Sequence, residues 1–125
     1  MTSNPNIPDA VEAREIESVE RAFQHIKKGG IVILVDDEDR ENEGDMVMAA
    51  EEATAENITL MTMAARGLIC TPMLGADLDR LELPMQVRKN TTEYHTAFTV
   101  TVDAKYGITT GISSADRSRT IQLLA

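Results

Sequence analysis

The chain is organised around a short apolar run and the acidic segment that follows it, Ile31-Val32-Ile33-Leu34-Val35 and Asp36-Asp37-Glu38-Asp39-Arg40-Glu41-Asn42-Glu43-Gly44-Asp45. The five apolar residues are mostly β-branched, which is typical of a strand that is buried on both faces. The next ten residues hold seven of the 21 acidic residues of the chain. The sequence therefore predicts a strand whose end leads into a concentrated group of carboxylates.

Alternation along this acidic segment would separate its side chains into two sets. If the segment stays extended, one side carries carboxylates alone: Asp37, Asp39, Glu41, Glu43 and Asp45. Two like charges about 4 Å apart repel by about 1 kcal/mol in water and about 4 kcal/mol at a protein surface. Such a loop favours a bound cation, and oxygen ligands without thiolates favour Mg²⁺ or Mn²⁺.

Three interpretations of the acidic loop compete. It is a solvated turn, an EF-hand calcium loop, or a catalytic loop that binds metal and substrate. The EF-hand pattern fails because Ala50 stands where a bidentate Glu is needed, because Glu41 and Glu43 replace Asp or Asn, and because a strand precedes the loop. The solvated turn and the catalytic loop both remain open from the pattern alone.

Charge and cysteine content exclude several classes of protein. The 125 residues carry a net charge of -9, which argues against nucleic acid and anionic membranes as partners. The chain shows no apolar run of about 18 residues, the length of a membrane span. Its single cysteine, Cys70, cannot form an internal disulfide and fits a reducing compartment. These features predict a cytoplasmic protein.

The order of the expected elements predicts an α+β fold, a mixed β-sheet with covering helices in a layered sandwich. Residues 1–13 are expected to form a flexible leader, and residues 14–125 a single domain. The expected elements are a helix from the N-cap Ser18 to Gly29, strands at 31–35 and 45–50, a helix from Thr54 to Ala65, a strand at 68–73, a short helix at 77–83, a strand at 97–102 and a final helix after Ser113.

Three isolated residues have ordinary structural interpretations. Cys70 follows the pattern of a small buried apolar residue, with an active-site position as the alternative. His25 has no partner motif and is interpreted as a surface histidine. His95 precedes the expected strand at 97–102 and is interpreted as a loop histidine rather than a metal ligand.

A second group of polar residues lies near the end of the chain, in Gly107-Ile108-Thr109-Thr110-Gly111-Ile112-Ser113-Ser114-Ala115-Asp116-Arg117. Ser113 and Asp116 have the spacing of a capping box, with Asp in place of Glu. The simpler interpretation is a helix N-cap. The alternative is an anion site, in which the hydroxyls of Thr110 and Ser113, free backbone N–H groups and Arg117 face a phosphate. Both interpretations remain open.

Both segments resemble 3,4-dihydroxy-2-butanone-4-phosphate synthase, an enzyme family of riboflavin biosynthesis. The resemblance is carried by Asp-Asp-Glu-Asp-Arg-Glu-Asn-Glu-Gly-Asp after an apolar strand and by Thr-Thr-Gly-x-Ser-x-x-Asp-Arg, and it spans residues 18–125. It implies an α+β fold, a homodimer with sites near the subunit interface, and a carbon-carbon lyase activity. The implied reaction converts ribulose 5-phosphate into 3,4-dihydroxy-2-butanone 4-phosphate and formate with Mg²⁺ (or Mn²⁺).

The resemblance also implies roles for individual residues. Glu41 is the implied metal ligand, and the implied catalytic residues are Glu41, Glu43 and Asp45. The implied substrate-binding residues are Arg40, Glu41, Asp45, Cys70, Thr110, Ser113, Asp116 and Arg117.

The chain differs from the family in its length. The family supplies an Arg-x-Gly-His-Thr stretch, which contains the metal-binding histidine, and a further catalytic Glu from a C-terminal part that these 125 residues do not contain. Residues 14–125 are therefore expected to be the N-terminal portion of a single synthase domain without activity of its own. The alternative is an inactive fragment that acts only as a divalent-cation-binding or interaction domain.

Overall fold

The computed structural model describes residues 10–125, with side chains from residue 14 onward. Its contacts divide the chain into two units, Met1–Ala53 and Thr54–Ala125, and each is described by itself. The expected leader, residues 1–13, falls mostly outside the described residues.

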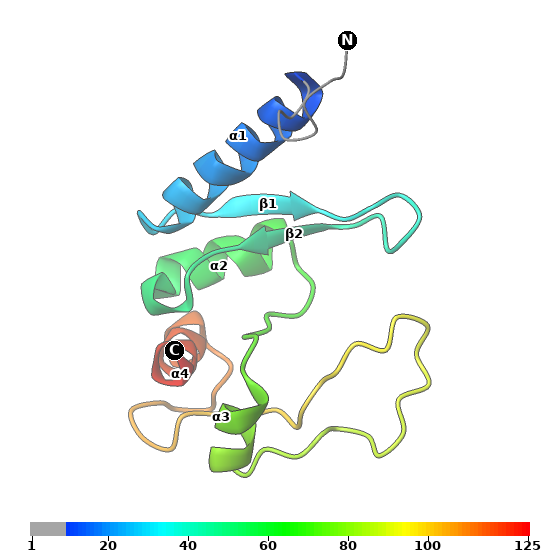
Figure 1. The fold of residues 1–125 in the computed structure, drawn as a ribbon. Helices are drawn as coiled ribbons and strands as arrows, with labels where there is room; N and C mark the ends of the chain where they lie inside the picture. The colour runs from blue at the N-terminus through cyan, green and yellow to red at the C-terminus, as the bar shows by residue number, and fades with distance from the viewer. Residues whose placement is uncertain (1–9) are drawn as a thin grey trace. The chain divides into compact units, whose positions relative to one another are not determined.

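The first unit begins with the helix α1, Ala10–Ile26, which packs against the strand β1, Val32–Val35 (Figure 1). The N-cap prediction at Ser18 was wrong, because the helix starts eight residues earlier. Good helix formers such as Glu15 and Arg14 extend the helix toward the N-terminus. The predicted end of the helix is confirmed: Gly29 follows α1 with φ 79°, and its N–H donates to the carbonyl of Ile26 at 2.9 Å.

The sheet of the first unit is an antiparallel hairpin of β1 and β2, Gly44–Val47, followed by the short 3-10 helix η1, Ala50–Glu52. Val32 pairs with Val47, and Val35 pairs with Gly44. The predicted burial of β1 on both faces was wrong, because Ile33 and Val35 are each 71% exposed. Within the described part of this unit the sheet has only two strands, and Ile33, Leu34 and Val35 stay exposed.

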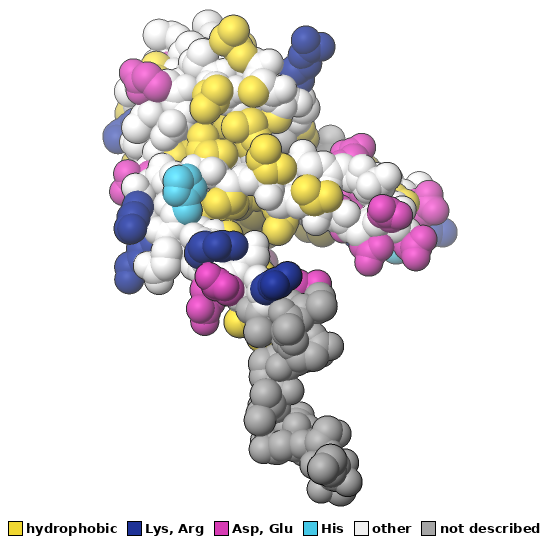
Figure 2. Space-filling view, turned by 90° about the horizontal axis from the view of Figure 1, so that it is seen from above, with side chains coloured by type: hydrophobic (Ala, Val, Ile, Leu, Met, Phe, Trp, Pro, Cys, Tyr) yellow, Lys and Arg dark blue, Asp and Glu magenta, His cyan; other side chains and the backbone are white. Residues whose placement is uncertain are grey.

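Hydrophobic side chains are therefore prominent on the surface of the first unit. Figure 2 shows a face of the molecule on which hydrophobic side chains lie in the open and acidic side chains gather at one end. Among residues 14–53, the large hydrophobic side chains that are at least half exposed are Ile16, Val19, Phe23, Ile33, Leu34 and Val35. Exposed apolar groups of this kind favour association with other surfaces.

The second unit contains the helices α2, Ala55–Ala64, α3, Gly75–Arg80, and α4, Ser114–Leu124. Its centre lies where α2 and α4 lie side by side (Figure 1). Both predicted N-caps are confirmed: Thr54 Oγ1 accepts a hydrogen bond from the N–H of Asn57 at 3.2 Å, and Ser113 Oγ accepts one from the N–H of Asp116 at 3.1 Å. Local side-chain chemistry thus sets where these two helices begin.

Two predicted strands do not form in the second unit. Residues 68–73 have no ladder partner among the described residues, and residues 97–102 contribute only an isolated bridge from Thr99 to Met85. Both segments have strand-like composition, but an extended segment becomes a strand only where a neighbour accepts its hydrogen bonds. The α+β class is confirmed, and the sheet in the described chain is the two-stranded antiparallel hairpin. No helix among residues 10–125 is long and apolar enough to cross a membrane.

Candidate functional site

The acidic loop, residues 36–43, closes the β1–β2 hairpin as a compact turn. The N–H groups of Arg40 and Asn42 both donate to the carbonyl of Asp37, at 3.0 and 3.2 Å, and Asn42 has a left-handed backbone with φ 50°. The N–H of Asp36 donates to the carbonyl of Glu43 at 3.0 Å, which ties the two ends of the loop together. The extended conformation on which the alternation of carboxylates depended does not form, because these backbone bonds curl residues 36–43.

The carboxylate of Asp36 holds the loop in this shape. Its Oδ2 atom lies 2.7 Å from a guanidinium nitrogen of Arg40 and accepts the N–H of Glu41 at 3.0 Å. The bond from the Glu41 N–H, and then the bonds with Asp37 and Arg40, lower the pKa of Asp36 despite its partial burial. Sequence reasoning did not single out this residue, although an Arg four positions after an Asp is a signal for such a pair.

The loop brings two of the predicted site residues together. The guanidinium of Arg40 lies 3.4 Å from the carboxylate of Glu41, and the Glu41 side chain is partly buried. Glu43 is exposed at the end of the loop, and Asp45 is exposed on β2 opposite Leu34. Arg40 and Glu41 thus contact each other within the loop, whereas Glu43 lies at its end and Asp45 lies on β2.

The acidic loop offers carboxylate oxygens, the ligand type that Mg²⁺ prefers. Among the described residues, no group of three or more His, Cys, Asp or Glu side chains is arranged to hold a metal ion. One oxygen of Asp36 is already bonded to Arg40 and to the Glu41 backbone. The loop can contribute Glu41 as one oxygen ligand, and Mg²⁺ in proteins commonly combines one or two carboxylates with waters and phosphate oxygens.

In the second unit the predicted substrate ligand Asp116 is a buried residue that holds a loop. It is 5% exposed. Its Oδ1 accepts the N–H of Thr109 at 3.1 Å, and its Oδ2 accepts the Thr109 hydroxyl at 2.7 Å and the N–H of Gly111 at 3.1 Å. Further along α4, Thr120 Oγ1 accepts the N–H of Ala104 at 3.0 Å. One face of α4 thus fixes the segment that precedes it.

These bonds predict an acid-sensitive loop. The bond from the Thr109 hydroxyl, and then the N–H bonds, lower the pKa of Asp116 below its ordinary value of 3.8. A carboxyl with a lowered folded pKa stabilises the fold above its unfolded pKa, and this contribution disappears as the pH falls through the folded value. We expect Asp116→Asn to lower the thermal midpoint at pH 7 by several degrees and to weaken the loss of stability below about pH 4, since the amide cannot titrate.

Thermal unfolding followed by circular dichroism between pH 2 and 7 measures both effects. Asp79→Asn, at an exposed position of α3, is the matched control and should melt like the parent. Equal midpoints for the Asp116 and Asp79 variants at pH 7 would contradict the role given to Asp116.

The other predicted residues of this unit are more open. Thr110, Ser113 and Cys70 are exposed, which excludes the buried interpretation of Cys70. Ser113 Oγ is engaged as the N-cap of α4. Arg117 lines a hollow of about 390 Å³, whose complete lining is Thr62, Arg66, Gly67, Ile112, Ser114 and Arg117. The structure thus places Arg117 beside residues that sequence reasoning did not single out, foremost Arg66.

The two isolated histidines lie at the exposed positions that the sequence predicted. His25 is exposed on α1, and His95 lies in an exposed loop with φ 53°.

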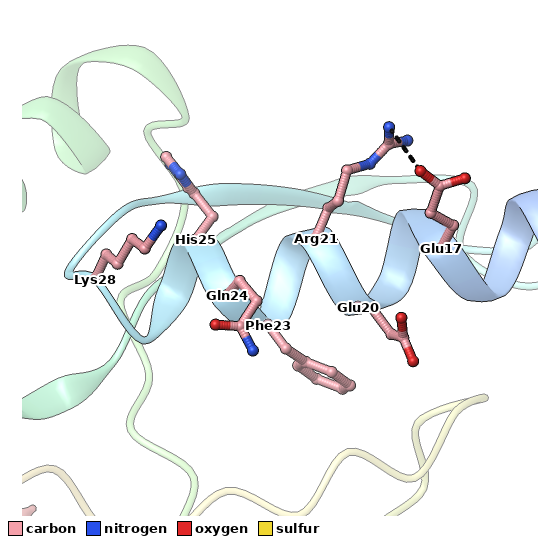
Figure 3. Close-up of a pocket in the computed structure, with 7 residues that line it drawn as sticks. All are labelled: Glu17, Glu20, Arg21, Phe23, Gln24, His25 and Lys28. Atoms are coloured by element: carbon pink, nitrogen blue, oxygen red, sulfur yellow. Dashed lines mark ion pairs between the residues drawn. The ribbon is translucent and has the colours of Figure 1, made fainter.

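A larger hollow, of about 660 Å³, lies along α1 (Figure 3). Arg21 points toward Glu17 and pairs with it at 3.7 Å, whereas Phe23 and Glu20 project from the other side of the helix in this view. The side chains that line this hollow point in different directions and include both acidic and basic groups. They do not gather around one point, as the residues of a binding site would.

Known proteins match this chain over both the acidic loop and the start of α4. The sequence profile of the family "3,4-dihydroxy-2-butanone 4-phosphate synthase" matches residues 20–125. The chain is 52% identical over 109 residues to riboflavin biosynthesis protein RibBA of Nocardia farcinica, a match that covers 87% of this chain and 26% of that protein. It is 50% identical over 109 residues to 3,4-dihydroxy-2-butanone 4-phosphate synthase of Agrobacterium fabrum, covering 87% of this chain and 51% of that protein.

Solved structures agree with these sequence matches. A crystal structure of 3,4-dihydroxy-2-butanone 4-phosphate synthase in complex with two magnesium ions superposes with a TM-score of 0.82 at 40% identity, covering 86% of this chain and 50% of that one. The chain therefore spans about half the length, or less, of these relatives. Because the family profile matches most of the sequence, the chain belongs to the 3,4-dihydroxy-2-butanone 4-phosphate synthase family.

Proposed function

We propose that residues 14–125 are the N-terminal portion of a single synthase domain. In the complete enzyme this domain converts D-ribulose 5-phosphate into 3,4-dihydroxy-2-butanone 4-phosphate and formate, a carbon-carbon lyase reaction of riboflavin biosynthesis. The observation that carries the proposal is the family match over residues 20–125, which includes both the acidic loop and the start of α4. A cytoplasmic location is part of the proposal, because the exposed thiol of Cys70 suits a reducing compartment.

The roles of the loop residues follow from their chemistry. Removal of a proton beside a ketone requires a positioned base, and carboxylates such as those of Glu41, Glu43 and Asp45 can move protons between successive steps. Arg40 offers a guanidinium to the substrate, and its bond to Asp36 fixes its position in advance. We assign substrate contacts to Arg40, Glu41 and Asp45 on this basis.

Glu41 is also the proposed ligand of Mg²⁺ or Mn²⁺. A magnesium complex is known for the family structure that superposes on this chain. Its remaining ligands are proposed to come from the C-terminal part of the domain, since the described residues do not assemble three candidate ligands.

The second unit is proposed to hold the phosphate of the substrate. Arg117 is supported because its side chain lines an open hollow. Thr110 and Ser113 are exposed and can contribute hydroxyls, and Cys70 is accessible to a ligand. Asp116 is proposed to act through the loop that it holds, because both of its oxygens already accept bonds from that loop.

A homodimer is the proposed assembly. The exposed apolar side chains of α1 and β1, such as Phe23 and Leu34, support it, since surfaces of this kind are commonly covered by a partner. Light scattering of the complete enzyme should give twice the mass of one chain.

The proposal predicts that this chain alone does not turn over substrate. Purified chain, free of host enzyme, should release no formate from ribulose 5-phosphate with Mg²⁺, because the other metal ligands are proposed to lie in the C-terminal part of the domain. Addition of a C-terminal half that carries the Arg-x-Gly-His-Thr stretch, in trans or fused, should restore formate release. Robust turnover by the chain alone would show that the missing part is not needed. Metal binding that is indifferent to the sugar phosphate would instead favour a cation-binding domain.

A further inference from the structure

Two arginines of the second unit line the same hollow without an acidic neighbour. Arg66 follows the C-cap of α2, and Arg117 lies in the second turn of α4. Their hollow, of about 390 Å³, contains no Asp or Glu in its lining. Among residues 14–125 neither guanidinium forms an ion pair, whereas Arg21, Arg40 and Arg80 all do. In a chain of net charge -9, two unpaired guanidinium groups that face one hollow are a local reversal of charge.

The other polar residues of the lining, Thr62 and Ser114, add no negative charge to the hollow. Ser114, the first residue of α4, lines the hollow, and its Oγ accepts the Thr59 hydroxyl at 2.8 Å. The first N–H groups of a helix have no acceptor within the helix, and the helix dipole adds positive potential at this end. The Thr62 hydroxyl donates to the backbone carbonyls of Ile58 and Thr59 in its own helix. The two arginines are therefore the side chains of the lining that are best suited to bind a ligand.

We propose that Arg66 and Arg117 together bind one oxyanion, the phosphate group of a phosphate monoester. Guanidinium groups match phosphate oxygens in geometry and charge, and two of them in the lining of one hollow suit a dianion. Identification of the monoester as the sugar phosphate rests on the proposed function, whereas affinity of the hollow for inorganic phosphate does not. The inference adds Arg66 to the anion site expected at Thr110, Ser113 and Arg117.

The backbone of Arg66 allows a test that separates binding from folding. Arg66 has a left-handed conformation with φ 63°, and its N–H donates to the carbonyl of Met61 at 3.2 Å. Glycine is the residue that this conformation favours. Arg66→Gly therefore removes the guanidinium while it relieves the backbone, so the thermal midpoint without phosphate should stay the same or rise.

The experiment is titration of the 125-residue chain with inorganic phosphate, and in a second arm with ribulose 5-phosphate, by calorimetry at constant ionic strength. Arg66→Gly, Arg66→Gln and Arg117→Gln should each raise the dissociation constant about tenfold in both arms. Arg119→Gln, an exposed residue of α4 outside the lining, is the matched control and should bind like the parent.

Two outcomes would overturn the inference. One is the absence of phosphate binding by the folded parent chain. The other is an equal loss of affinity in the Arg119 control, which would indicate a response to net charge alone. Either result leaves the formate assay of the completed enzyme untouched, so failure of this site and failure of the proposed reaction are distinguishable.

Discussion

Glu41→Gln should reduce formate release by the completed synthase by about 10²–10⁴-fold, the range typical of a lost proton-transfer group. Gln has nearly the shape of Glu but can neither exchange the proton nor supply the anionic oxygen proposed for the metal. The loop should survive the change, because its bond to Asp36 uses the backbone N–H of Glu41. Only the contact at 3.4 Å between the Glu41 carboxylate and Arg40 is altered.

The matched control for this prediction is Glu38→Gln. Glu38 is an exposed acid of the same loop with no proposed role, so its replacement removes the same charge from the same segment. Formate release is measured over a range of ribulose 5-phosphate and Mg²⁺ concentrations, with folding checked by circular dichroism. If the two variants lose activity equally, the charge of the loop matters rather than Glu41, and the assignment of Glu41 fails.

The sequence predicted those elements that local chemistry determines. Thr54 and Ser113 begin α2 and α4 as expected, because a capping hydroxyl needs only a backbone N–H three residues away. The hairpin was also predictable, since an apolar run, a polar turn and a second apolar run stand in succession. The α+β class and the family follow from these elements and from the two motifs.

The sequence could not predict what depends on distant partners. Residues 68–73 and 97–102 have the composition of strands, but no ladder forms around them in the described chain. The prediction that β1 is buried was wrong for the same reason, because the burial of a strand depends on the elements that pack against it and not on its own sequence. The role of Asp116 was also missed. Its spacing from Ser113 suggested a cap, whereas its carboxylate bonds to Thr109 and Gly111, earlier in the chain.

The curled loop shows a related limit. The carboxylates were divided into two sets on the condition that the segment is extended, but Asp36 accepts bonds from Arg40 and from the Glu41 backbone, and the segment curls. The arrangement makes Arg40 and Glu41 the ordered pair of the loop, and this distinction could not be read from the spacing.

Ile58→Ala should be the most damaging single substitution for the fold of the second unit. Ile58 lies on α2 and is 1% exposed, the largest fully buried side chain among the described residues. The other buried residues of this unit are Gly111 and three polar members of α4, Asp116, Ser118 and Thr120. Removal of a buried Ile side chain typically costs about 2–5 kcal/mol of the free energy of unfolding. Small domains have only about 5–15 kcal/mol in total.

Denaturant unfolding of the 125-residue chain, followed by circular dichroism, measures this cost. Met63→Ala is the matched control, because it truncates a side chain of the same helix that is 74% exposed and should change the unfolding free energy by less than about 0.5 kcal/mol. Ile58→Val, which removes one methyl group, should fall between them at about 0.5–1.5 kcal/mol.

This graded order follows if Ile58 is the apolar centre between α2 and α4. Equal effects of the Ile58→Ala and Met63→Ala substitutions would show that the two helices are held by their polar contacts alone, such as the bond at 2.8 Å between the Thr59 and Ser114 hydroxyls.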